Sequence, residues 1–363
     1  MSFLNKIGYS LYKSVGDDYD EMLDDLLSKT DNDAAILRLV FFTAVDNNND
    51  YKNKLSILER KVSEYFNSRK PVVTLVAQNP LDADLILEVH SYTPSEDDKV
   101  EYKSYNGYTY VLVTGGYGKS LYAGGLQSDI DADILTQSKK VFGILGDILK
   151  FEGFPIDSIV RQWNYIERIT DFDSDGNQHY QMFNNARSDF YSSVEWARGY
   201  PAATGIGTFG GGVLIDFDAV MPVNNILKVV PIDNKLQVAA HAYSEKVLEK
   251  ASSGLSTPKF ERAKCLEYKS NKLIYISGTA AIRGEESLSE HNILSHLNVT
   301  LENIRQLTGD SELKLLRVYL KDPSFYDKVN EAMSVMPDLM VSYLLANVCR
   351  DELLIEIEGI SFK

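Results

Sequence analysis

Cysteine is nearly absent from this chain, and so are long hydrophobic runs. Only Cys265 and Cys349 occur among 363 residues, so there is neither a disulfide framework nor a paired CxxC zinc motif. No apolar run approaches the roughly 20 residues that a membrane-spanning helix needs, and the N-terminal MSFLNKIGYS lacks the apolar core of a signal peptide. We therefore expect a cytoplasmic protein that is not bound to a membrane.

Basic residues are also scarce. Lys and Arg number 37 against 52 Asp and Glu, which gives a formal net charge of −15. Nucleic-acid binding depends on cations that neutralise phosphates, so this excess of acids, with no compensating basic run, argues against nucleic acid as a partner. A small substrate is favoured, and an anionic one needs a few local arginines to hold it.

Motifs for metals and cofactors are missing too. The five histidines show no HExxH or paired-ligand spacing. The segment DFDSDGN at 171–177 begins like a calcium loop, but Met182 stands where that loop needs a bidentate Glu. TGGYG (114–118) and TFGGG (208–212) fit neither GxxxxGK[ST] nor GxGxxG, so turns explain them. We expect no metal and no cofactor.

What the chain does contain is a pattern that recurs three times. Residues 344–360 end in an alternating strand that carries Glu356 and Glu358 on one face, and residues 73–90 repeat its ten-residue step with Glu88 in the place of Glu356. A third copy, GGVLIDFDAV, has Asp216 and Asp218 at the same two places. Such a repeat indicates a duplicated folding unit.

The repeat and its surroundings predict an α/β protein with mixed α+β sheets and packed helices. Apolar strands alternate with helical segments, and the copies delimit three related units near 18–93, 108–220 and 265–361. With their connections these units divide the chain into 1–104, 105–264 and 265–363, and the first unit is truncated at its front. A chain of 363 residues suits such units sharing one core.

The middle unit contains an unusual strand, SIVRQWNYIERI. Its alternation places Arg161, Trp163 and Tyr165 on one face, and an arginine there is costly unless it meets an anion or a carboxylate. Two interpretations stay open: Arg161 binds a ligand, or it pairs internally with Glu167 or another acid. Further along, Arg187 falls in a helix predicted over residues 179–196, and Thr204 lies within a run of small residues that would let a ligand approach the backbone.

Several segments together carry a family resemblance. LIYISGTAAIRGEES (273–287), LLRVYLKDP (315–323) and CRDELLIEIEG (349–359) resemble the Rid/YjgF family, also called endoribonuclease L-PSP, which forms homotrimers with clefts between subunits. RQWNYIERI, YQMFNNARSDF and YPAATGIG add a resemblance to the chorismatase family, which has the same fold and splits chorismate into pyruvate and either a hydroxybenzoate or a dihydroxycyclohexadiene carboxylate. Three Rid-like units in one chain imply a pseudo-trimer, and hence a monomer or weak dimer.

The chorismatase resemblance also implies roles for single residues. Glu356 matches the catalytic acid that protonates the enolpyruvyl methylene. Arg161 and Arg187 would bind the two carboxylates of chorismate, and Tyr165 and Thr204 would supply hydroxyl groups. By the same resemblance, the substrate-binding residues include Thr279 of SGTAAI and Cys349, a cysteine carried by family members that make 3-hydroxybenzoate.

The sequence departs from the family pattern in two places. Ala186 precedes Arg187 where a glycine is usual, and Glu285 stands where many chorismatases have histidine. Two other functions therefore stay open: a Rid-type deaminase, and a catalytically silent protein that binds a small ligand on the same fold. Against the deaminase, no arginine occurs in the four residues after Pro337, where those enzymes hold the substrate carboxylate.

Overall fold

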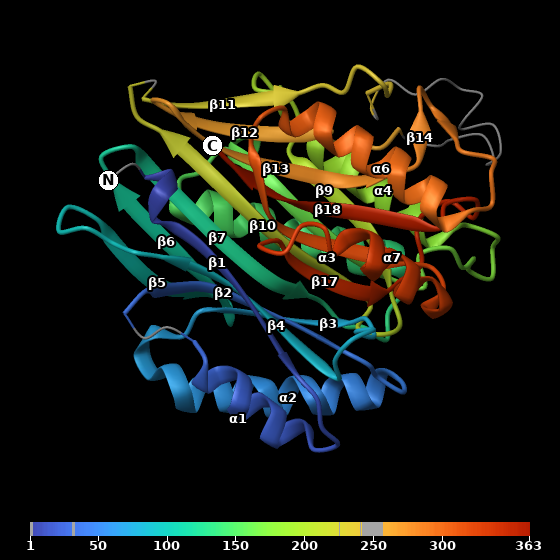
Figure 1. Cartoon of the computed structure of the whole chain (residues 1–363). Helices are drawn as coiled ribbons and strands as arrows, with labels where there is room; N and C mark the ends of the chain where they lie inside the picture. The colour runs from blue at the N-terminus through green and yellow to red at the C-terminus, as the bar shows by residue number, and fades with distance from the viewer. Residues whose placement is uncertain (1–2, 31–32, 225, 240, 242–256) are drawn as a thin grey trace.

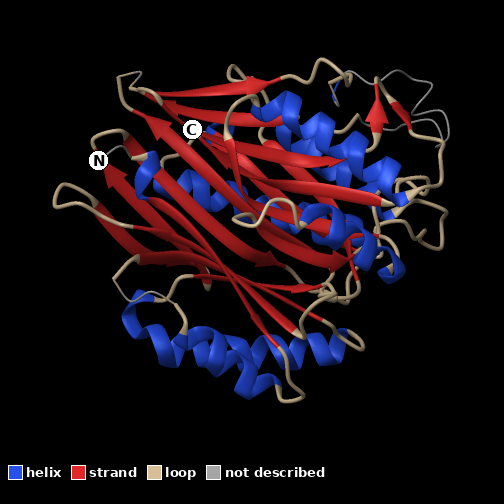
Figure 2. Ribbon diagram, in the orientation of Figure 1, coloured by secondary structure: helices blue, strands red, loops and turns tan. Residues whose placement is uncertain are grey.

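The computed structural model describes residues 3–30, 33–224, 226–239, 241 and 257–363. Three β-sheets lie together in the middle of the molecule, and helices cover them from outside (Figures 1 and 2). The two ends of the chain lie on the same side of the molecule (Figure 1).

The three sheets follow one another along the chain. The first has the strand order β1-β4-β2-β3, the second β5-β6-β7-β10-β8-β9, and the third β11-β12-β13-β18-β16-β17. The first segment comprises η1 (Leu4–Lys6), β1 (Ile7–Ser14), α1 (Tyr19–Ser28), β2 (Ala35–Thr43), α2 (Asn48–Phe66), η2 (Asn67–Arg69), β3 (Val72–Ala77) and β4 (Leu85–Tyr92).

The second segment comprises β5 (Lys99–Tyr105), β6 (Tyr108–Gly115), β7 (Gly118–Gln127), α3 (Ile134–Glu152), η3 (Ile156–Ser158), β8 (Ile159–Glu167), α4 (His179–Tyr191), β9 (Ala202–Thr208) and β10 (Val213–Pro222). The third comprises β11 (Leu227–Ile232), β12 (Ala263–Tyr268), β13 (Asn271–Ala280), β14 (Ile282–Arg283), β15 (Glu286–Ser287), α6 (Ile293–Thr308), β16 (Glu312–Leu320), η5 (Pro323–Phe325), α7 (Tyr326–Met333), β17 (Met340–Leu345) and β18 (Ile355–Phe362).

A βαβαββ order recurs in all three segments. It runs β1-α1-β2-α2-β3-β4, then β7-α3-β8-α4-β9-β10, then β13-α6-β16-α7-β17-β18. In each copy the last strand pairs antiparallel with the second, and the second pairs parallel with the third. This repetition confirms the expected architecture of related units in one chain.

Local sequence signals fix the ends of several helices. Asp18, Asn47, Asp133 and Asn292 precede α1, α2, α3 and α6, and each side chain accepts a backbone N–H of the first turn. α3 ends at Gly153, whose φ of 73° lies in the left-handed region that glycine adopts without strain.

Three details differ from the expectations. The repeat begins at β1 rather than near residue 18; its residues IGYSLYKS are nearly all half-buried, so the hydrophobic pattern is weak. β5 pairs with β6 and β11 with β12, so the sheets divide the chain at about 93–98 and 223–226 rather than after residues 104 and 264. α4 ends at Tyr191, before the expected end at Trp196.

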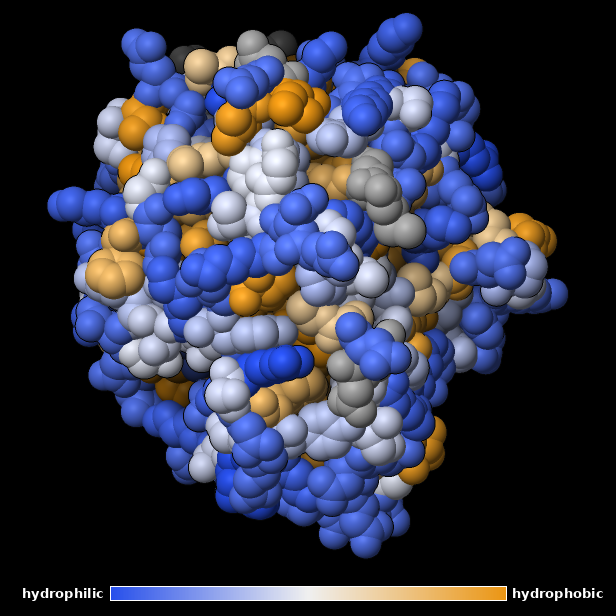
Figure 3. Space-filling model, turned by 90° about the vertical axis from the view of Figure 1, so that its left-hand side faces the viewer, coloured by the Kyte–Doolittle hydropathy of each residue, from blue (hydrophilic) through white to orange (hydrophobic). Residues whose placement is uncertain are grey.

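All three sheets contribute residues to common hydrophobic clusters. One cluster of buried side chains combines Phe42 of the first sheet, Trp163 of the second and Tyr319 of the third. On the outside, the face in Figure 3 is mostly hydrophilic, with hydrophobic residues in small groups. Among the described helices, none is long and apolar enough to cross a membrane.

Candidate active site

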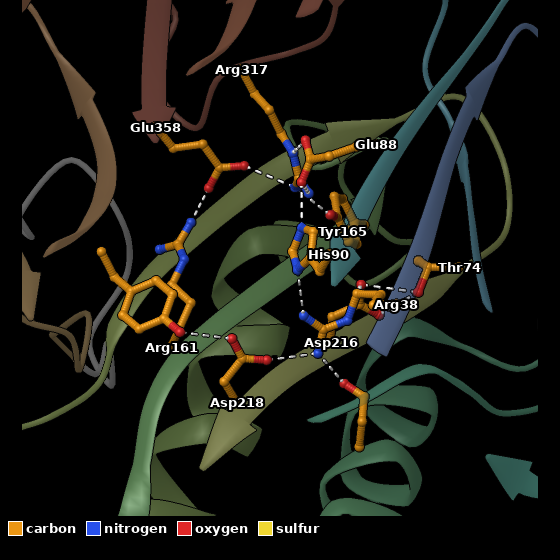
Figure 4. A network of polar contacts seen from close by, with 12 residues as sticks. Arg38, Thr74, Glu88, His90, Arg161, Tyr165, Asp216, Asp218, Arg317 and Glu358 are labelled. Atoms are coloured by element: carbon orange, nitrogen blue, oxygen red, sulfur yellow. Dashed lines mark hydrogen bonds and ion pairs between the residues drawn. The ribbon is translucent and has the colours of Figure 1, made fainter. Parts of the chain in front are cut away.

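Three arginines occupy equivalent positions in the three sheets. Arg38 on β2, Arg161 on β8 and Arg317 on β16 each lie opposite the second polar residue of the neighbouring strand, which is His90, Asp218 or Glu358 respectively. All three side chains point into the space between the sheets (Figure 4). They are at most 3% exposed, so each needs a partner for its charge.

Each arginine bonds to an acid from a different sheet. Arg38 of the first sheet donates from Nη2 to Asp218 Oδ1 of the second at 2.8 Å (Figure 4). Arg161 of the second sheet donates from Nη2 to Glu358 Oε2 of the third. Arg317 closes the circle, since its Nε and Nη2 donate to the two oxygens of Glu88 at 2.8 and 2.7 Å. We call this group the arginine network.

Trp163 lies at the centre of the arginine network. Its ring centroid is 4.6 Å from the guanidinium carbon of Arg161, 5.0 Å from that of Arg38 and 5.6 Å from that of Arg317. Such contacts stabilise a cation that has been removed from water. Burial raises the pKa of Glu88, but Arg317 and the hydrogen bonds from His90 and Arg317 outweigh it and hold that pKa well below the usual range.

This arrangement shows which acid pairs with Arg161 inside the protein. The guanidinium is paired internally, with Glu358 and not with Glu167, whose carboxylate accepts from Asn48 Nδ2 and the Gly212 N–H. Binding of a substrate carboxylate by Arg161 stays a prediction, and in this structure Glu358 is the carboxylate that its guanidinium meets.

Tyr165 and Thr204 also belong to the arginine network. The Tyr165 hydroxyl accepts from Arg317 Nη1 at 2.7 Å, and Thr204 Oγ1 accepts from Arg161 Nη2 at 2.8 Å and donates to Glu358. Thr204 additionally borders Glu356: a Cβ built on Gly278 would meet the Glu356 carboxyl on one side and lie 3.1 Å from the Thr204 methyl on the other. Among the described residues, no hydrogen bond joins Tyr165 to Glu356.

Glu356 lies on β18 opposite Tyr319 of β16 and Ala280 of β13. Its carboxyl occupies the space that the missing side chain of Gly278 leaves open. Burial and the nearby charge of Glu358 raise its pKa to about 8, against the opposing effect of the guanidinium groups of Arg262, Arg161 and Arg350. A carboxyl group with this pKa carries a transferable proton near neutral pH.

A group of polar side chains surrounds Glu356, and we call it the Glu356 cluster. Its members next to Glu356 are Tyr180 of α4, Arg262 beside β12, and Cys349 and Arg350 before β18. Arg187 of α4 belongs to the cluster through Tyr180. Burial and the charge of Glu356 raise the pKa of the Cys349 thiol to about 12, although Arg350 and Tyr180 lower it. Burial and Cys349 likewise raise the pKa of Tyr180, while Arg187 lowers it.

Arg187 differs from the three network arginines. It is 2% exposed and its Nη2 donates to Asn184 Oδ1, but across the described residues no ion pair joins it to a carboxylate and its Nε makes no hydrogen bond. A buried cation without a carboxylate partner is costly in the free protein. This position therefore suits an anionic ligand.

The structure shows what each of Thr279, Ala186 and Glu285 contacts or packs against. Thr279 is buried and donates to the Ser277 carbonyl at 2.8 Å, so its hydroxyl stabilises an irregular stretch of β13. Ala186 is 3% exposed and packs in the core of the second segment. Arg350 Nη1 donates at 3.0 Å to the backbone carbonyl of Glu285, so it ties the β14–β15 turn to the Glu356 cluster.

The three equivalent acids have different environments. Glu88 is ion-paired with Arg317, and Asp216 accepts from Thr74 Oγ1 at 2.8 Å and from the Gly125 N–H at 2.8 Å. Within the described part of the chain, the Glu356 carboxyl accepts no hydrogen bond. Of the three, Glu356 is thus the acid that no hydrogen bond or ion pair holds among the described residues.

Sequence reasoning missed Tyr180, Arg262 and Arg350. Tyr180 and Arg187 are two helical turns apart, so they share one face of α4, and this spacing could have identified Tyr180. Arg350 directly follows Cys349, which had been selected. Arg262 gave no local signal, because the approach of the segment before β12 to β18 depends on the third sheet as a whole.

Fold and site together define an α+β protein of three related units with a buried, protonatable carboxyl among basic side chains. A sequence family described as "Chorismatase FkbO/Hyg5-like, N-terminal" matches residues 95–219. A "3-hydroxybenzoate synthase" of Streptomyces hygroscopicus is 30% identical over 233 residues, covering 58% of this chain and 65% of that protein. A "Chorismatase" of Streptomyces rapamycinicus is 28% identical over 243 residues, covering 61% and 67%.

A solved structure extends the likeness to the whole fold. The crystal structure of a chorismatase superposes with a TM-score of 0.71 at 20% identity, over 98% of both chains. The family model, the curated relatives and this structure thus all point to chorismatases, which confirms the resemblance drawn from the sequence motifs. In sequence, the match spans somewhat less than two thirds of the 3-hydroxybenzoate synthase.

Proposed function

We propose that this protein removes the enolpyruvyl group of chorismate as pyruvate, with Glu356 as the general acid. The observation that carries the proposal is the buried Glu356 carboxyl, whose pKa is raised to about 8 and which is close to the guanidinium groups of Arg262, Arg161 and Arg350. Arg187 lies near Tyr180 of the same cluster. Chorismate carries two carboxylates, and a site for it needs cations together with an acid that is protonated near neutral pH.

In this proposal Arg187 binds a substrate carboxylate and Glu356 donates its proton to the enolpyruvyl methylene carbon, which becomes the methyl group of pyruvate. The bond between the ring carbon and the ether oxygen then breaks. If a ring proton returns to Glu356, the other product is a hydroxybenzoate and no atoms are added overall. If water adds to the ring, the product is a dihydroxycyclohexadiene carboxylate.

We further propose a hydroxybenzoate as the product. Cys349 lies near Glu356 and matches a cysteine of the family members that make 3-hydroxybenzoate. The relative from Streptomyces hygroscopicus is also named for 3-hydroxybenzoate. The three sheets pack against one another within one chain, so no second copy is needed to complete the fold. We therefore also propose a monomer or weak dimer. We further propose that the protein is located in the cytoplasm.

The direct test is incubation of the purified protein with chorismate. We expect pyruvate, followed with a coupled lactate dehydrogenase assay, and one equivalent of hydroxybenzoate, identified by chromatography. Pyruvate with a dihydroxycyclohexadiene carboxylate would retain the enolpyruvyl reaction and reject the product assignment. Absence of pyruvate release would reject the proposed reaction.

Arg187→Met should weaken chorismate binding by about 2–4 kcal/mol, because it removes a charge-assisted contact with a carboxylate. The fold should persist, since within the described residues the guanidinium pairs with no carboxylate. Calorimetric titration with chorismate, alongside a circular dichroism spectrum, measures both quantities. Unchanged affinity would show that Arg187 does not contact the substrate.

The pH dependence should report the state of Glu356. Its pKa is raised to about 8 by burial and Glu358, so the acid form is present below about pH 8 and is lost above it. We expect kcat/KM for pyruvate release to fall about tenfold per pH unit on the alkaline side of that pKa. A profile that stays flat to pH 10, where the carboxyl is ionised, would exclude Glu356 as the proton donor.

A further inference from the structure

The boundary between the first and second sheets repeats the surroundings of Glu356. There Asp216 of β10 takes the place of Glu356, Gly124 that of Gly278, and Thr74 of β3 that of Thr204. A Cβ built on Gly124 would lie 3.0 Å from Thr74 Oγ1 and would collide with the Asp216 carboxyl. The boundary between the first and second sheets is therefore structurally equivalent to the boundary between the second and third sheets, where the Glu356 cluster lies.

A cavity of about 360 Å³ opens at this second boundary. Its volume lies within the usual range of small-molecule sites. Tyr51 and Leu55 of α2, Leu75 of β3, Tyr108 of β6 and Leu214 of β10 are among its lining residues, together with polar residues and glycines. The aromatic and aliphatic members suit the faces of a compact ring, and the polar members can bond to its substituents.

The polar groups of the cavity restrict the charge of that ring. Lys70 is the one cation among the described lining residues, and the acids Glu59 and Asp129 also line the cavity. No ion pair joins Lys70 to an acid in the part of the chain that the structure describes. The Glu356 cluster, in contrast, contains three arginines. A dicarboxylate would be repelled at the second boundary, whereas a single carboxylate can bind Lys70.

A hydroxyl group completes the set. Ser128 lines the same cavity, and its buried Oγ has no hydrogen-bond partner among the described residues. A buried hydroxyl without a partner is costly, and a hydroxyl on the ligand would satisfy it. Gln127, next to it, is bonded to Tyr51 and thus fixes the wall of the cavity.

We propose that this cavity is a second ligand site, which takes a small cyclic monocarboxylate bearing a hydroxyl group, with its carboxylate on Lys70. The chemical class is that of a hydroxybenzoate, so the identity of the natural ligand rests on the proposed function. The cavity itself is separate from the Glu356 cluster, because it lies between the first and second sheets and not between the second and third.

The test is calorimetric titration with 3-hydroxybenzoate in an Arg187→Met background, where binding at the Glu356 cluster is impaired. We expect one retained binding event, which Lys70→Met weakens about tenfold or more and Lys70→Arg restores. Thr109→Trp, which places a large side chain at the cavity wall, should abolish it. 3-Hydroxybenzyl alcohol, which lacks the carboxylate, should bind at least about tenfold more weakly.

Pyruvate release from chorismate provides the matched control. Lys70→Met alone should leave it at the wild-type rate, because Lys70 is remote from the Glu356 cluster. No binding in the Arg187→Met background, or binding that Lys70→Met and Thr109→Trp leave intact, would overturn the second site. If the wild type releases no pyruvate while Lys70-dependent binding persists, the proposed reaction fails and the second site stands.

Discussion

Arg317→Met is expected to lower the free energy of unfolding by about 3–5 kcal/mol, the cost of removing one partner from a buried ion pair. Arg317 supplies three donors to two carboxylates, Glu88 and Glu358, and a fourth contact to the Tyr165 hydroxyl. After the substitution, His90 is the one hydrogen-bonding partner left to Glu88 among the described residues. Burial lowers the pKa of His90 itself, so the carboxylate loses its principal counter-charge. Urea denaturation at pH 7 measures the difference.

Arg187→Met is the matched control for this prediction. Both arginines are buried, and both substitutions remove a guanidinium and leave a side chain of similar length. Across the described residues, however, Arg187 pairs with no carboxylate, so its replacement should cost far less stability. Equal losses of unfolding free energy in the two variants would show that the ion pairs of the arginine network do not determine its stability.

The repeat was predictable from sequence because each copy keeps a local signal. The alternation around Glu356, Asp216 and Glu88 placed these acids correctly on equivalent strands. β1 was missed because its half-buried residues carry little hydrophobic contrast. Strand pairings such as β5 with β6 follow from the closure of whole sheets, which no short window of sequence encodes.

The candidate site was only partly predictable for a related reason. A strand pattern shows which face Arg161 occupies, but its partner Glu358 comes from another sheet, 197 positions along the chain. Sequence patterns also could not show that Arg161 pairs with a carboxylate whereas Arg187, among the described residues, does not. Three-fold repetition explains the difference: Arg161 has counterparts in Arg38 and Arg317, whereas Arg187 belongs to α4 and to the Glu356 cluster alone.

Glu356→Gln should lower the turnover of chorismate by about 100-fold or more while leaving substrate affinity largely intact. Glutamine keeps the shape and the hydrogen-bonding capacity of the protonated acid but has no proton to give to the methylene carbon. The substitution should not cost stability. Burial raises the pKa of Glu356 to about 8 in the folded protein, above the pKa of a glutamate in the unfolded chain. As pH rises between these two pKa values, the unfolded chain loses this proton first, so the carboxyl lowers the stability of the fold increasingly.

Glu88→Gln is the control that shows whether the loss of turnover is specific to Glu356 or follows from removing any buried carboxylate. Glu88 is the equivalent acid of the first sheet, but its pKa is held low by Arg317, so it is ionised and paired at neutral pH. Its replacement should lower the unfolding free energy and leave turnover per folded molecule near that of the wild type, the opposite of the pattern at Glu356. Pyruvate release that survives Glu356→Gln at a near normal rate, or that falls equally in Glu88→Gln once the folded fraction is measured, would show that the proton comes from another group.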